Sequence, residues 1–122
     1  MKKILFILLY VFSTATSACA EWTDTDKKLY IASQLAIIAD WSTTRYAARH
    51  NFPNGTYETN IILGRQPSVA KVDLYCIGLL LTNHLIADAM PNELRGFYFT
   101  FRTVAHGAAS IHNVQAGWQM RF

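Results

Sequence analysis

The chain has 122 residues, of which 52% are hydrophobic and 16% are charged, and its formal net charge is +3. This length allows one compact domain, and such a low charged fraction is typical of a chain that contacts a membrane rather than of an ordinary soluble domain. The 11 Lys and Arg residues are scattered. Because nucleic-acid binding requires clustered positive charge, we expect no nucleic acid among the partners.

The start of the chain has the three parts of a secretory signal peptide. Lys2 and Lys3 precede an apolar run at residues 4–12, which is followed by small residues. Ala18 and Ala20 occupy the two small positions of an A-x-A cleavage site. The sequence therefore predicts export.

Cleavage would remove residues 1–20 and leave residues 21–122 as a single helical membrane domain. Cys76 would then be the sole cysteine, so we expect no internal disulfide. Two alternatives stay open for this segment. Lipidation at Cys19 would anchor the protein through a lipid, and an uncleaved segment would itself serve as a membrane anchor.

The first predicted helix begins at Thr23 or Asp24. Either residue can cap it, because short polar side chains accept hydrogen bonds from the free N–H groups of a first turn. Pro53 and Gly55 end the helical pattern. Apolar residues recur between these limits at helical spacing, so we expect one apolar face and an opposite polar face that carries Asp40.

The second predicted helix opens at Pro67 or Ser68 and ends at Pro91. Its apolar stretch contains Asn83 and His84 as its only strongly polar side chains. Together with its flanking residues, this stretch approaches the roughly 20 residues that cross a bilayer. It is the most membrane-like part of the chain after the signal segment.

The third predicted helix covers residues 93–118. Within it, Thr103, His106, Ser110 and Asn113 recur at helical spacing and form a polar stripe. The end of the chain alternates apolar and polar residues, as a strand does. We interpret it as a helix end with an aromatic tail, with a strand as the alternative. The predicted fold is therefore all-α, a three-helix membrane bundle after an N-terminal signal segment.

The basic residues predict how the bundle crosses the membrane. Arg45, Arg49, Arg65 and Lys71 lie in or near the first loop, and the positive-inside rule places such a loop in the cytoplasm. The expected location is the bacterial inner membrane. Membrane lipid and a protein of the envelope are the expected partners.

Two charged residues argue for an alternative location. Asp40 and Arg102 each cost roughly 2.5–3.5 kcal/mol at the centre of a membrane helix unless they find partners. A compact helical bundle in the periplasm, resting on the membrane or lipid-anchored, would avoid this cost.

Polar residues at the end of the first helix and in the loop after it form a motif, D-x-x-T followed by G-x-x-E-x-N. The residues that carry it are Asp40, Thr43, Gly55, Glu58 and Asn60. The motif, continued by LGRQPS at residues 63–68, resembles a family of small polytopic membrane proteins of bacteria and their phages. Ile61 stands where that family has proline. The resemblance implies a helical membrane protein and no particular reaction, and it leaves open a phage-type envelope modulator that acts in lysis or exclusion.

A catalytic interpretation uses some of the same residues. Asp40, Glu58 and His84 would be the catalytic residues of a membrane-embedded metal-dependent hydrolase, since carboxylates and histidines bind divalent metals or act as acid and base. His84, Asp88 and His106 are the candidate ligands, and a divalent metal would be the cofactor. No HExxH, nucleophile elbow, phosphate loop or CxxC supports this reading.

We favour a structural interpretation of the polar residues. Asp40, Thr43 and Thr44 share one helical turn and can hydrogen-bond to each other and to the loop, while Glu58 and Asn60 brace the start of the second helix. Such contacts contribute about 0.6–2 kcal/mol each in membrane bundles. The sequence thus predicts a small exported helical membrane protein with a structural or accessory role in the cell envelope, rather than an enzyme.

Overall fold

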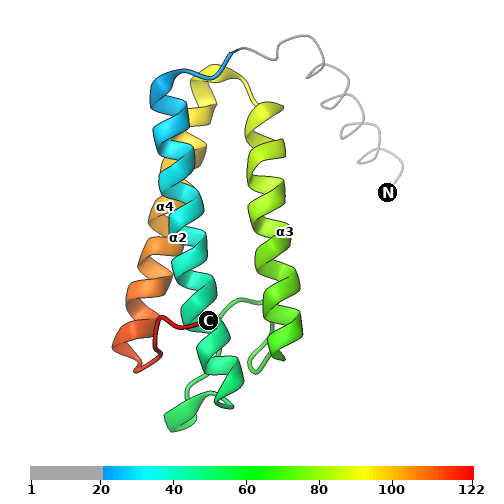
Figure 1. Cartoon of the computed structure of the whole chain (residues 1–122), viewed down its shortest axis with the longest axis vertical. Coiled ribbons are helices and arrows are strands. Elements are labelled where there is room, and N and C mark those ends of the chain that lie inside the picture. Colours follow the sequence, from blue (N-terminus) through cyan, green and yellow to red (C-terminus); the bar gives the residue numbers. More distant parts are fainter. Residues whose placement is uncertain (1–20) are drawn as a thin grey trace, which may run out of the picture.

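The computed structural model describes residues 21–122, which form three long α-helices and a short 3-10 helix (Figure 1). In chain order these are α2 (Asp24–Arg49), η2 (Pro53–Gly55), α3 (Val69–Asp88) and α4 (Asn92–Gln115). Residues 21–122 contain no strand, so the all-α prediction is confirmed and the tail is not a strand. The predicted signal peptide lies outside the described residues.

The helices begin at the residues whose side chains can cap them. Thr23 and Asp26 form a capping box at the start of α2, with each side chain bound to the backbone N–H of the other at 3.0–3.1 Å. Ser68 Oγ accepts from Lys71 N at the start of α3. The short link through Pro91 turns the chain directly into α4. The predicted starts of the first two helices are therefore confirmed.

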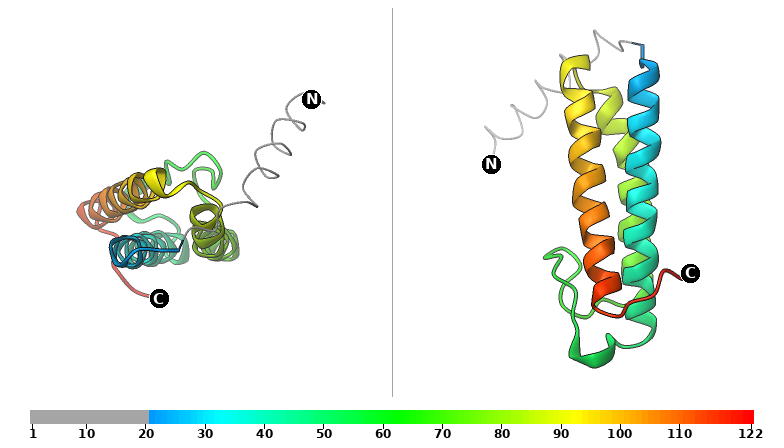
Figure 2. Two further views of the ribbon diagram at one scale, coloured as in Figure 1. Left: turned by 90° about the horizontal axis from the view of Figure 1, so that it is seen from above. Right: turned by 90° about the vertical axis from the view of Figure 1, so that its left-hand side faces the viewer.

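The helix α2 lies between the other two (Figure 1). α4 runs parallel to α2 and packs along it, whereas α3 runs antiparallel to both (Figure 2). α3 makes fewer contacts with α2, and α3 and α4 barely touch. The bundle is therefore a tightly joined pair of helices with a third helix held more loosely beside it.

The turn that follows α2 uses left-handed backbone conformations. Asn51, Phe52 and Asn54 have φ of 52°, 52° and 60°, which costs a non-glycine residue about 1–2 kcal/mol. Phe52 keeps this conformation because its ring is buried and meets the Trp118 ring edge-on, with the centroids 5.5 Å apart. The turn sends residues 50–68, called the polar loop below, back along the end of α4 (Figure 2).

A Schellman motif ends α4 and places its last aromatic residue. Trp118 N donates to Asn113 O and Gly117 N donates to Val114 O, both at 3.0 Å, with Gly117 at φ 88°. The Trp118 indole N–H then donates to Thr56 Oγ1 at 2.9 Å. This bond ties the polar loop to α4.

Polar side chains join the helices at the end where α2 begins. Arg95 of α4 is fully buried, and its guanidinium donates to Asp26 Oδ2 at 3.4 Å, to Ala87 O at 3.0 Å and to Met90 O at 3.3 Å. One side chain therefore connects the start of α4 to the start of α2 and the end of α3.

Two further polar contacts hold α3 against α2. Near the middle of the bundle, Asn83 Nδ2 donates to Ser33 Oγ at 2.9 Å and to Gln34 Oε1 at 2.8 Å. Nearer the polar loop, Asp73 Oδ1 accepts from Trp41 Nε1 at 2.8 Å and from Arg45 Nε at 2.7 Å. Arg45 is thus paired within the bundle.

Burial in this bundle is inverted relative to an ordinary soluble protein. As many polar or charged residues are buried as apolar ones, and the polar set is Asp26, Ser33, Ser42, Thr43, Thr44, Asn83, Arg95, Ser110 and Asn113. Large apolar side chains point outward instead, among them Leu74, Ile77, Leu81, Leu85, Phe97, Phe101, Val104 and Ile111. The clusters of buried apolar side chains, around Phe52 and around Val72, lie at the polar-loop end.

Replacing Arg95 by alanine tests the buried contact at the start of α4. The change removes the cationic partner of the buried Asp26 carboxylate and a donor to two carbonyls, so we expect the free energy of unfolding to fall by about 3–5 kcal/mol. Denaturant unfolding measures it. Lys28→Ala, at an exposed position of α2, is the control and should change little. Equal effects of the two variants would contradict the role assigned to Arg95.

Candidate functional site

Asp40 lies where α2 meets the second half of α4. Its Oδ2 is 2.8 Å from His106 Nδ1, and its Oδ1 accepts from Asn113 Nδ2 at 3.2 Å and from Thr44 Oγ1 at 3.4 Å. The residue that was predicted to be a brace or a catalytic acid is therefore bonded to two residues of the predicted stripe on α4.

The contact with Asp40 determines which nitrogen of the His106 ring carries a proton. An ionised carboxylate can only accept hydrogen bonds, so Nδ1 of His106 carries the proton and donates it. In the neutral ring Nε2 then has a free lone pair. Because both side chains are largely buried, the ring is held in one orientation.

Asn113 extends this network to the neighbouring threonines. Its Nδ2 also lies 2.9 Å from Thr43 Oγ1 and 3.3 Å from Thr44 Oγ1. Thr43 Oγ1 in turn donates to the Asp40 carbonyl at 2.9 Å. The predicted contact within the Asp40, Thr43 and Thr44 turn is present, and it is completed by α4 rather than by the loop.

The polar loop brings Glu58 and Asn60 to the same end of the bundle. Glu58 Oε1 accepts from the Asn60 backbone N–H at 2.8 Å, and Asn60 Nδ2 donates to the Tyr75 hydroxyl of α3 at 2.9 Å. Asn60 Oδ1 accepts from Ile62 N. Asn60 therefore fastens the loop to the first turns of α3, and Glu58 is oriented by the same turn.

These side chains surround a cavity of about 300 Å³. It is lined by Asp40 of α2, Glu58 and Asn60 of the polar loop, Cys76 of α3, and His106 of α4. This cavity, bounded by α2, α3, α4 and the loop and lined in part by polar side chains, is the strongest candidate for a functional site in the described chain.

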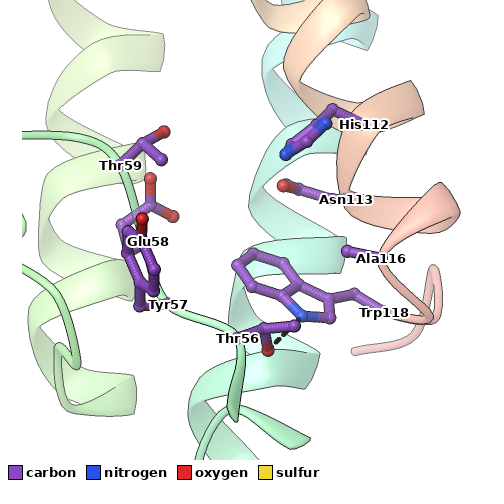
Figure 3. A pocket seen from close by; sticks show the side chains of 8 residues that line it. All are labelled: Thr56, Tyr57, Glu58, Thr59, His112, Asn113, Ala116 and Trp118. Atoms are coloured by element: carbon purple, nitrogen blue, oxygen red, sulfur yellow. Dashed lines mark hydrogen bonds between the residues drawn. The ribbon is translucent and has the colours of Figure 1, made fainter. Parts of the chain in front are cut away.

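A second cavity of about 200 Å³ adjoins the first. The two share Glu58, Thr59, His112 and Asn113. Figure 3 shows Glu58 and Thr59 of the polar loop facing His112 and Asn113 of α4, with the Trp118 ring beside them. The two cavities together form a trough with an aromatic wall at one end and the Asp40–His106 pair at the other.

His84 does not join Asp40 and Glu58, which corrects the predicted catalytic set. Its ring packs on Trp22 and Tyr30, with centroids 5.0 and 5.6 Å away, near the start of α2. The reason is helix length: His84 lies 16 residues beyond the Ser68 cap, about 24 Å from the loop end, whereas Asp40 is about 14 Å from that end. His106, nine residues before the end of α4, is at the same height as Asp40.

The predicted metal ligands are also separated. Asp88 accepts from the Trp22 indole N–H at 3.1 Å instead of orienting His84, and His106 is bonded to Asp40. Among residues 21–122, no three His, Cys, Asp or Glu side chains lie close enough together to hold a metal ion. The arrangement suits hydrogen bonding and proton exchange at His106 better than metal binding.

Three basic residues at the polar-loop end are bound elsewhere. Arg45 pairs with Asp73, the Arg65 guanidinium lies 4.3 Å from the Tyr57 ring centroid, and Lys71 Nζ donates to a backbone carbonyl at 2.7 Å. Within the described chain, Glu58 has no cationic partner.

The sequence indicated the polar stripe on α4 but not its partner. His106 and Asn113 are seven residues apart and so share a face of the helix. Asp40 and His106 each lie nine residues before the end of their helix. In two parallel helices with aligned ends, this equal distance would bring the two residues together. Tyr75 gives no such signal, because nothing in the sequence around it distinguishes it from the other aromatic residues of the chain.

Comparison of the chain with protein-family models, with curated proteins and with solved structures finds no match.

Replacing Asn113 by alanine tests the link between α2 and α4. The change removes an amide whose two N–H groups serve a buried network of three oxygens, so we expect a loss of about 1–2 kcal/mol in the free energy of unfolding. Gln115→Ala, on an exposed face of the same helical turn, is the matched control. Thermal unfolding measures both. Equal unfolding temperatures for the two variants would show that the hydrogen bonds of Asn113 do not stabilise the fold.

Proposed function

We propose that the protein is an integral membrane protein with three spanning helices and a structural or accessory role in the cell envelope. The observation that carries this proposal is the inverted burial of the bundle. A protein in water hides its large apolar side chains, whereas a protein in lipid can expose them and keeps its polar contacts inside.

The apolar side chains point outward all around the bundle. Leu74 is 75% exposed and Leu81 64% on α3, while Phe97 is 74% and Val104 64% exposed on α4. Ile31 and Leu35 add a third such face on α2. Soluble monomers rarely expose apolar patches larger than a few hundred Å², so a lipid environment is the natural solvent for this surface.

Helix length and composition add to the argument. At 1.5 Å per residue, α2, α3 and α4 extend about 39, 30 and 36 Å, which suffices for a hydrocarbon core of about 30 Å. By length and composition α3 is the one described helix apolar enough to cross a membrane, and only 17% of its apolar stretch is buried. α2 and α4 are less apolar on average because their polar residues, such as Thr43 and Asn113, face each other inside the bundle.

The charges favour one orientation. At the polar-loop end lie the five basic residues Arg45, Arg49, Arg65, Lys71 and Arg121, and at the opposite end Lys27, Lys28 and Arg95 are outnumbered by acidic residues. The positive-inside rule then places the polar loop in the cytoplasm and the α3–α4 link outside. This is the arrangement expected in a bacterial inner membrane after export of the N-terminus.

An accessory role fits the chemistry of the interior better than hydrolysis. The polar residues that resemble those of small polytopic membrane proteins, Asp40 and Thr43, are engaged in helix contacts. Partners would meet the protein through its lipid-facing surface, so we propose membrane lipid and an envelope protein as its contacts.

Replacing Leu81 by lysine separates a lipid-facing surface from a water-facing one. In a bilayer the change costs about 3 kcal/mol near a helix centre, so the fraction of protein that stays in membranes after alkaline carbonate should fall well below that of the unmodified protein. In water, an exposed position would tolerate the change within about 0.5 kcal/mol.

Ile61→Lys is the matched control, because Ile61 is 96% exposed in the polar loop. We expect it to stay in the membrane fraction. Release of the unmodified protein by carbonate, or equal integration of the two lysine variants, would overturn the membrane assignment.

Cysteine labelling tests the orientation. In intact cells a membrane-impermeant maleimide should label Asn92→Cys and spare Ile61→Cys, since the first lies at the outer end and the second in the cytoplasmic loop under the positive-inside rule. Both should be labelled after the cells are opened, relative to the labelling of the parent protein. The reverse pattern would mean that the bundle is inserted the other way round.

A further inference from the structure

We propose that the trough between the polar loop and α4 binds a primary ammonium group, carried by an amine-bearing lipid headgroup or by a small free amine. The lipid source rests on the proposed membrane function, whereas the free amine does not. Three observations carry the proposal. Hydrogen-bond acceptors in the trough are held in fixed positions, the Glu58 carboxylate has no cationic partner in the described chain, and the two cavities are large enough for a small ligand.

The trough offers acceptors that are already held in place. In the neutral His106 ring, Nε2 is an acceptor because Nδ1 carries the proton and donates to Asp40. One Glu58 oxygen accepts from Asn60 N, and the other has no hydrogen bond within the described chain. A primary ammonium brings three N–H donors and no acceptor, so it matches an acceptor-rich wall better than a phosphate or a carboxylate does.

The charges around the trough favour a cation. Glu58 has no cationic partner among residues 21–122, although three basic residues lie at the same end of the bundle. Each of these has another partner: Asp73 for Arg45, the Tyr57 ring for Arg65 and the Leu63 carbonyl for Lys71. Neither cavity is lined by a Lys or Arg residue, so an anion would meet two carboxylates and no counter-charge.

A metal ion is the other cation to consider. Zinc sites in proteins use three or four His, Cys, Asp or Glu ligands, and no such group exists in the part of the chain that the structure describes. An ammonium needs only hydrogen-bond acceptors at separate points. His106 and Glu58, on opposite elements that line one cavity, supply them.

The space suits a headgroup-sized ligand. The two cavities measure about 300 and 200 Å³, which together lie within the usual range for small-molecule sites. The Trp118 ring forms one wall of the smaller cavity (Figure 3), and an aromatic face also attracts cations. In the proposed orientation, the basic residues at the polar-loop end lie at the cytoplasmic surface of the membrane, where lipid headgroups lie.

The test uses the unmodified full chain in detergent and compares ligands that differ by one chemical feature. Ethanolamine and phosphatidylethanolamine carry the primary ammonium, while choline and phosphatidylcholine keep the charge and lack its N–H donors. Thermal unfolding and titration calorimetry should show that ethanolamine, phosphatidylethanolamine or both bind. Choline and phosphatidylcholine should not bind. Binding of free ethanolamine identifies a soluble amine as sufficient, and binding of phosphatidylethanolamine alone identifies the lipid headgroup.

A variant pair localises the binding. Glu58→Gln removes the unpaired charge with little change of shape and should weaken binding by tenfold or more, since a hydrogen bond to a charged group contributes about 1.5–3 kcal/mol. Glu93→Gln, at the opposite end of the bundle, is the control and should bind as the unmodified protein does.

Equal binding of the ammonium and choline forms, no binding of either, or unchanged affinity in Glu58→Gln would overturn the proposal. The ligand comparison needs no variant, so it stays decisive even if Glu58→Gln fails to fold. Release of the protein by carbonate would overturn the membrane assignment and leave ethanolamine binding intact, so the two failures are distinguishable.

Discussion

The hydrogen bonds that Asp40 accepts from His106 and Asn113 are the contacts on which the arrangement of the bundle depends. They join two parallel helices that are separated in sequence by the whole of α3. If the outer surface lies in lipid, burial of apolar area gives little reason for helices to associate, and packing together with directional polar contacts must do so. Apolar packing alone is also non-directional. Because the Asp40 carboxylate accepts from donors on one face of α4, it specifies which face of α4 packs against α2 and how far along α2 the contact lies.

The same contacts prepare the cavity. A histidine that is free to rotate would present either ring nitrogen to its surroundings, whereas Asp40 holds Nδ1 of His106 and leaves Nε2 available. From sequence, a structural and a catalytic role for Asp40 are alternatives. The geometry makes them compatible, because the bond that positions α4 is also the bond that orients the ring.

Much of the fold could be predicted from sequence because its signals are local. Thr23 and Ser68 cap helices, and a capping side chain lies within three residues of the N–H that it satisfies. The pairing of side chains across helices is not local in this sense. His84 and His106 both lie on predicted helices, and which of them meets Asp40 depends on the direction and height of each helix. The sequence also could not reveal that Phe52 adopts a left-handed conformation, because that strain is offset by a contact with the end of α4.

The cavity lies between the closely packed pair α2 and α4 on one side and the less tightly packed α3 and polar loop on the other. α2 and α4 are joined along their length, while α3 is attached to α2 by a few polar contacts and barely touches α4. The polar loop is fixed by Tyr75 on α3 and by Trp118 after α4. An occupant that bonds to both Glu58 and His106 would therefore add a connection between the loop and α4 where the chain supplies few of its own. Binding to the folded form alone raises its stability, so occupancy of the site and cohesion of the bundle are thermodynamically linked through Asp40.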